Sequence, residues 1–166
     1  MLILIKLFIM SEISKITEIA NVMCLYQKLQ NVEKECITNT QILFDIINDN
    51  YPHLDVKAKP CFVIEQNKDK KYVKIIVHII IYINNKTIID PSYETCSLKN
   101  ALYIDTINDI KDLLGDFFKN NSKYLITKFL KLNDYCNKMN TKKERVVNSE
   151  YYNNVFDFLA SRCELN

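Results

Sequence analysis

The stretch that decides the fold class runs from residue 60 to residue 91, PCFVIEQNKDKKYVKIIVHIIIYINNKTIIDP. Residues 60–64 and 72–83 are apolar runs, and the second is rich enough in β-branched residues to predict a central β-strand. Polar residues 66–71 predict a turn between them. Asn84-Asn85 predicts a hairpin, because asparagine tolerates positive φ, and residues 86–90 then form the returning strand that Pro91 ends. This stretch therefore predicts an antiparallel sheet.

Helical periodicity appears on both sides of this sheet. Apolar residues at helical spacing predict helices over 11–30, from Cys36 to about 50, and near 107–119, 123–138 and 149–162. The order of helices, antiparallel sheet and helices is typical of an α+β domain. With 166 residues the chain fits one domain. We expect it to span residues 11–166, with a core over 30–98 and a helical C-terminal part over 99–166.

The first ten residues, MLILIKLFIM, are strongly apolar. They are too few to span a bilayer, and neither a basic leading segment nor a small-residue cleavage site surrounds them. Ser11 is a suitable helix cap, so residues 1–10 are interpreted as an apolar N-terminal extension. A membrane-contacting tail formed by residues 1–9 is a further, weaker hypothesis.

Composition excludes several classes of function. The net charge is only +2, from 22 basic and 20 acidic residues spread along the chain, so no basic stripe indicates nucleic-acid binding. The chain has a single glycine, Gly115, which disfavours glycine-rich nucleotide-binding loops. Its 6 cysteines form no CxxC pair, so no zinc site is expected. No other metal or cofactor is predicted, and scattered thiols favour a cytoplasmic protein.

Only two histidines are available for catalysis, His53 and His78. His53 lies in a predicted loop after a proline, whereas His78 lies inside an apolar strand, where a buried imidazole needs a hydrogen-bond partner. Asp90 ends the returning strand and is a candidate partner that would orient the imidazole, although Asp90-Pro91 is also a common turn sequence. A two-residue hairpin loop would place them on opposite faces. We expect a three-residue loop or a bulge, which would make His78 and Asp90 direct partners on one face.

Cys36 is the candidate nucleophile because it precedes a predicted helix. The N–H groups and the dipole of a helix N-terminus favour a thiolate, whereas Glu33 and Glu35 nearby oppose it. A protonated His78 would be needed to restore the balance. Taken by position alone, a cysteine is more often an inert buried residue.

The order of these residues resembles that of transglutaminase-like enzymes, a branch of the papain-like cysteine enzymes. The resemblance covers residues 36–94 and is carried by Cys36 at a helix start, a strand histidine, and the closing Asp-Pro in VHIIIYINNKTIIDPSYE, residues 77–94. It implies that Cys36 is the nucleophile, His78 the general base and Asp90 the acid that orients it. Gln30, six residues before the cysteine, is the corresponding oxyanion candidate, and a surface role at a helix end is its alternative. The backbone N–H of Cys36 is a second candidate donor.

These features predict a thiol-dependent acyl-transfer enzyme of the peptidase, amidase, deamidase or transglutaminase type. Its substrate would be a protein, a peptide or a small amide or acyl donor, without nucleic acid and without a stable membrane span. The alternative is a catalytically inactive domain of the same fold that binds a protein partner.

Overall fold

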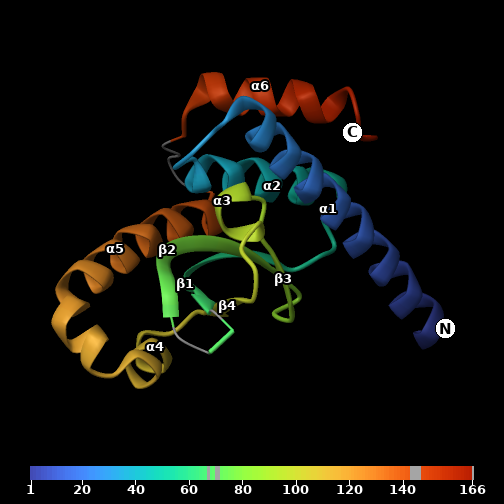
Figure 1. Ribbon diagram of the computed structural model, residues 1–166. Helices are drawn as coiled ribbons and strands as arrows, with labels where there is room; N and C mark the ends of the chain where they lie inside the picture. The colour runs from blue at the N-terminus through green and yellow to red at the C-terminus, as the bar shows by residue number, and fades with distance from the viewer. Residues whose placement is uncertain (67, 70–71, 143–146, 166) are drawn as a thin grey trace.

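The computed structural model describes residues 1–66, 68–69, 72–142 and 147–165, and it confirms an α+β architecture (Figure 1). The helices are α1 (Leu2–Gln30), α2 (Cys36–Asn50), α3 (Tyr93–Cys96), α4 (Ile107–Leu114), α5 (Asp116–Asn140) and α6 (Ser149–Ala160). The strands are β1 (Val56–Gln66), β2 (Tyr72–Ile83), β3 (Thr87–Ile89) and β4 (Ala101–Ile104). Two helices precede the sheet and three long segments of helix follow it, as the periodicity predicts.

The sheet is antiparallel throughout, with the strand order β3-β2-β1-β4. β2 has the predicted bounds, whereas β1 begins four residues before the expected Pro60 and extends two residues past Ile64. β4 was not expected from the sequence, because its four residues ALYI are too short for a clear alternation. Of the turn predicted over 66–71, residues 67, 70 and 71 lie outside the described residues.

The β2–β3 hairpin has the predicted three-residue loop. Ile83 pairs with Thr87, so residues 84–86 form the connection. Asn84 and Asn85 both have φ of 53°, and the N–H of Lys86 donates to the carbonyl oxygen of Ile83 at 3.1 Å. Asparagine adopts this left-handed conformation at small cost, which is why the pair marks the turn.

The two faces of the sheet are packed differently. The odd-numbered β2 residues Val77, Ile79 and Ile81 belong to the main core, together with residues of α1, α2, α5 and α6. On the opposite face, Ile80 packs with Cys61 and Val63 in a smaller cluster. Because side chains alternate along a strand, His78 shares this second face with Ile80.

Helix α1 starts earlier than predicted, and Ser11 lies inside it rather than at its cap. Residues 2–10 have no glycine or proline to interrupt the helix, so the first turns continue directly into the amphipathic part. Their apolar side chains are mostly exposed, and in Figure 1 this end of α1 projects beyond the other elements. Among the described residues, no helix is both long and apolar enough to cross a membrane.

Gly115 separates two helices where the sequence predicted one over 107–119. Its φ of 51° and ψ of −122° are readily adopted only by glycine, and they end α4 before α5 begins. The expected gap between 119 and 123 is absent, because α5 continues through it to Asn140. Helix α6 ends at Ala160, two residues before the predicted end.

Candidate functional site

His78 and Asp90 form a buried ion pair. Nε2 of His78 lies 2.9 Å from Oδ1 of Asp90, and the two side chains are only 2% and 6% exposed. β2 supplies the histidine, and the aspartate follows β3 directly, before Pro91. The predicted contact between these two side chains is therefore present.

The register of this contact differs from the prediction. Ile81 pairs with Ile89, so continuation of the β2–β3 register places Asp90 opposite Ile80 rather than opposite His78. His78 and Asp90 share one face of the sheet, as expected, but they meet diagonally. The expectation that His78 and Asp90 are direct cross-strand partners was wrong. With a three-residue loop, the residue opposite Asp90 is Ile80, two positions after His78 in β2.

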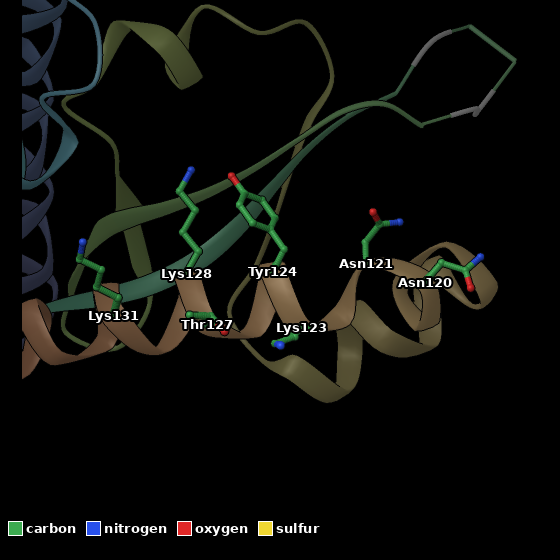
Figure 2. Close-up of a pocket in the computed structure, with 7 residues that line it drawn as sticks. All are labelled: Asn120, Asn121, Lys123, Tyr124, Thr127, Lys128 and Lys131. Atoms are coloured by element: carbon green, nitrogen blue, oxygen red, sulfur yellow. The ribbon is translucent and has the colours of Figure 1, made fainter.

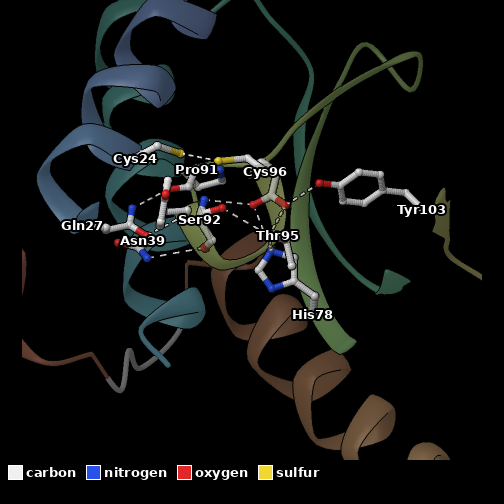
Figure 3. A network of polar contacts seen from close by, with 11 residues as sticks. Cys24, Gln27, Asn39, His78, Pro91, Ser92, Thr95, Cys96 and Tyr103 are labelled. Atoms are coloured by element: carbon white, nitrogen blue, oxygen red, sulfur yellow. Dashed lines mark hydrogen bonds and ion pairs between the residues drawn. The ribbon is translucent and has the colours of Figure 1, made fainter. Parts of the chain in front are cut away.

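A second set of donors holds the Asp90 carboxylate. The backbone N–H of Ser92 donates to Oδ1 at 3.0 Å, while the hydroxyl groups of Thr95 and Tyr103 donate to Oδ2, the latter at 2.8 Å. The Thr95 oxygen also lies 3.0 Å from Nε2 of His78. Figure 3 shows Thr95 and Tyr103 approaching this centre from α3 and from β4. The carboxylate is thus fixed on both oxygens.

These contacts decide the charge state of the pair. Burial by itself lowers the pKa of His78, but the charge and hydrogen bond of Asp90 outweigh it and raise the pKa to about 10. For Asp90, burial acts to raise the pKa, and the neighbouring His78 with the hydrogen bonds of Thr95 and Ser92 lowers it below its usual value. At neutral pH the pair is an imidazolium and a carboxylate.

Cys36 is the first residue of α2, as predicted, and is partly exposed. Its thiol lies near the imidazole, since an interaction with Cys36 is among the influences that raise the pKa of His78. The preceding residue, Glu35, accepts hydrogen bonds from the Thr38 hydroxyl at 2.9 Å and the Asn148 amide at 3.0 Å. The structure thus brings together Cys36 of α2, His78 of β2 and Asp90, which follows β3.

Gln30 is exposed at the last position of α1, and no contact with the Cys36–His78–Asp90 set is found for it among the described residues. The buried glutamine of this helix is Gln27, which is 3% exposed. Its amide nitrogen donates to the carbonyl oxygen of Pro91 at 2.6 Å, and its amide oxygen accepts from the N–H of Tyr93 at 2.9 Å. Gln27 therefore fastens the segment that follows Asp90 to α1.

Asn39 makes a similar connection from α2. Its side chain donates to the Ser92 hydroxyl at 3.5 Å and accepts from the hydroxyl of Tyr151 in α6 at 2.6 Å. The sequence patterns did not indicate Gln27, Asn39, Thr95 or Tyr103 as site residues. Polar residues inside apolar helix faces were the available signal for Gln27 and Asn39, whereas nothing in the sequence distinguishes Tyr103 from the other tyrosines.

The remaining polar features lie apart from this set. His53, which lies in a loop as predicted, pairs with Glu12 of α1 at 2.8 Å and is 49% exposed. A hollow along α5 has Asn121, Tyr124 and Lys128 among its lining residues, and none of Cys36, His78 and Asp90 (Figure 2). Over the described part of the chain, no group of three or more His, Cys, Asp or Glu side chains is placed to hold a metal ion.

Comparisons with known proteins found no matching family model, no matching curated protein and no matching solved structure.

Proposed function

We propose that the chain is a thiol-dependent acyl-transfer enzyme in which Cys36 is the nucleophile, His78 the proton donor and acceptor, and Asp90 the residue that orients His78. The observation that carries the proposal is the buried His78–Asp90 ion pair beside the Cys36 thiol. An imidazolium next to a thiol at a helix start is the arrangement that activates cysteine nucleophiles. The resemblance to transglutaminase-like enzymes assigns the same roles.

Nε2 of His78 is occupied by Asp90 and Thr95. In this mechanism the other ring nitrogen, Nδ1, exchanges the proton with Cys36. Because Asp90 accepts from Ser92, Thr95 and Tyr103 as well, its carboxylate has little freedom to turn, and the imidazole orientation is held with it. Asp90 acts here as the third member of a catalytic triad does.

In the first half-reaction, the Cys36 thiolate attacks the carbonyl carbon of an amide or ester. A carbon–sulfur bond forms, and the carbonyl electron pair moves onto the oxygen. His78 then donates its proton to the leaving nitrogen or oxygen as the tetrahedral intermediate collapses to a thioester. In the second half-reaction, neutral His78 takes a proton from water or an amine, which attacks the thioester and releases Cys36 as a thiolate.

The start of α2 supplies donors for the negative oxygen of the intermediate. The N-cap residue Glu35 makes no side-chain hydrogen bond to the first-turn N–H groups of the helix. These groups, including the N–H of Cys36, point out of the helix end and are suited to stabilise an oxyanion. We assign this role to them rather than to Gln30, which is exposed.

Partners follow from this chemistry. The substrate is a protein, a peptide or a small amide or acyl donor whose carbonyl reaches the partly exposed Cys36. A reducing compartment such as the cytoplasm suits the proposal, because the reaction requires the free thiol.

The proposal is tested by site-resolved alkylation. The wild-type chain, Cys36→Ser and His78→Gln are treated with limiting iodoacetamide at pH 7, and each cysteine is followed by peptide mass spectrometry. We expect Cys36 to be alkylated in the wild-type chain, and its rate to fall at least tenfold in His78→Gln. Cys163→Ser is the matched control, because Cys163 is also partly exposed, and it should leave the Cys36 rate unchanged.

The same variants are then incubated with p-nitrophenyl acetate. Release of p-nitrophenolate, with an acetyl group found on Cys36, is the expected result for the wild-type chain, and neither should occur in Cys36→Ser. Circular dichroism shows whether each variant is folded. If His78→Gln does not fold, the test still rests on Cys36→Ser, because that variant exchanges only one atom at a partly exposed site. Turnover that survives in Cys36→Ser would refute the mechanism.

The alternative is a protein-binding module in which the same three residues are structural. The deep burial of His78, which is 2% exposed, and the exposed apolar start of α1 favour it. This alternative predicts that Cys36 alkylates no faster than Cys163 and that no acyl group is transferred. The two experiments above therefore separate it from the enzyme.

A further inference from the structure

Two cysteines far apart in the sequence meet beside the site. The sulfur atoms of Cys24 in α1 and Cys96 at the end of α3 are 2.8 Å apart, although 72 positions separate the residues (Figure 3). Cys24 is buried, while Cys96 is exposed to solvent. A disulfide bond would require the sulfur atoms to approach by only about 0.8 Å more, since its length is about 2.05 Å.

The surrounding contacts hold this pair in place. Gln27 lies on the same side of α1 as Cys24, three residues further along, and bonds to Pro91 and Tyr93. The backbone N–H of Cys96 donates to the carbonyl oxygen of Ser92 at 2.9 Å, closing the turn of α3. Hydrogen bonds that do not involve the two sulfur atoms therefore hold the segments that carry both cysteines. Neither cysteine needs to move far for a disulfide bond to form.

We propose that Cys24 and Cys96 form a reversible redox site, a cystine that ties α1 to the segment carrying Asp90 and Thr95. This inference does not rest on the proposed function, because neither Cys36 nor His78 takes part. The sequence favoured inert, buried cysteines in general. Cys61 and Cys136 are buried, whereas Cys96 is exposed and lies against Cys24.

The oxidant is a low-molecular-weight disulfide such as glutathione disulfide. The Cys96 thiolate attacks one sulfur of that disulfide, whose S–S bond breaks and releases one glutathione thiolate. Cys24 then loses its proton to solvent, and its thiolate attacks the Cys96 sulfur, releasing the second glutathione. The two protein thiols are oxidised and one glutathione disulfide is reduced to two thiols.

The order of attack follows from exposure and from the shared hydrogen bond. Cys96 is the accessible sulfur, and its hydrogen bond with Cys24 lowers its pKa. The same hydrogen bond and burial raise the pKa of Cys24, which makes it the second thiol to react. In the reduced pair, Cys96 is thus the thiol that ionises more readily, as its role as the first attacking sulfur requires.

The test uses the full chain in its native state. Protein reduced and then freed of reductant is incubated with glutathione disulfide at pH 8, remaining thiols are blocked with N-ethylmaleimide in denaturant, and the digest is mapped by mass spectrometry. We expect a linked peptide pair containing Cys24 and Cys96. Since the bond closes a loop of 72 residues, Tm should rise by roughly 5 to 10 °C and return on addition of dithiothreitol.

Cys96→Ser should show neither the linked peptides nor the rise in Tm, whereas Cys163→Ser should show both. A glutathione adduct that stays on Cys96 while Cys24 remains free would overturn the proposal. A Cys24–Cys96 link that forms only in urea would overturn it equally, because the native arrangement would then not be its cause. Cys36 alkylation and acyl transfer are measured in separate experiments. The absence of a Cys24–Cys96 link would therefore leave the proposed acyl-transfer function standing, and the absence of acyl transfer would leave the redox site standing.

Discussion

Replacing Asp90 by asparagine should change both the size and the pH dependence of the chain's stability. The charge and the hydrogen bond of Asp90 raise the pKa of His78, and the pair is almost completely buried. Asparagine keeps the shape and can still accept the N–H of Ser92 and of a neutral imidazole, but it loses the charge. Removing one partner of a buried ion pair costs about 3 to 5 kcal/mol, and the retained acceptor favours the lower end of this range.

The pH dependence follows from His78. The pKa of this imidazole is 6.5 in the absence of the interactions of the fold, which is the value for the unfolded chain, and about 10 in the folded chain. A group with a raised pKa stabilises the fold fully below 6.5, and this contribution is lost as pH rises toward 10. Between pH 6 and pH 8 the unfolded imidazole releases its proton while the folded one keeps it, so the free energy of unfolding should fall by about 2 kcal/mol.

In Asp90→Asn, burial is the dominant influence left on His78, and the native imidazole becomes neutral over the same range. The fall in stability between pH 6 and pH 8 should then disappear. The free energy of unfolding is measured by urea titration with circular dichroism at pH 6, 7 and 8, in the presence of a reductant. The unfolded thiols titrate near 8.5, mostly above this window, and they are common to both chains.

His53→Gln is the matched control. His53 is the other histidine of the chain, and its removal leaves the His78–Asp90 pair intact, so the wild-type slope should remain. A slope in Asp90→Asn equal to that of the wild type would refute the reasoning. So would a slope that vanishes in His53→Gln, because the titrating group would then be the wrong histidine.

Two other substitutions test the packing around the site and the core. Tyr103→Phe removes the hydroxyl that donates to Asp90 at 2.8 Å and should lower the free energy of unfolding by about 1.5 kcal/mol in the same urea assay; an unchanged value would mean that Thr95 alone satisfies that oxygen. Phe62→Ala removes a ring that is fully buried and stacked on Phe129 with 4.9 Å between centroids. It should cost about 3 to 5 kcal/mol, against less than about 0.5 kcal/mol for the exposed Phe117→Ala, and similar losses in both variants would contradict the assigned core.

The sequence alone determined the elements whose signals are local. The β-branched run of residues 72–83 predicted β2 with its observed bounds, and Asn84-Asn85 predicted the loop because asparagine readily takes positive φ. The start of α2 at Cys36 was also predicted from its neighbourhood. The same local signals failed at Ser11, where a good capping residue lies inside a helix because nothing before it breaks the helical conformation.

Only the tertiary structure decided how these elements combine into a site. The loop length could be predicted, but the diagonal meeting of His78 and Asp90 depends on the register and on the chain's turn after β3. Tyr103 reaches Asp90 from β4, a strand without a clear pattern of its own, and Cys24 meets Cys96 across 72 positions. Such contacts arise from the packing of α1, α3 and the sheet, and packing depends on every element at once, whereas a sequence pattern reports only the conformation of the residues within it.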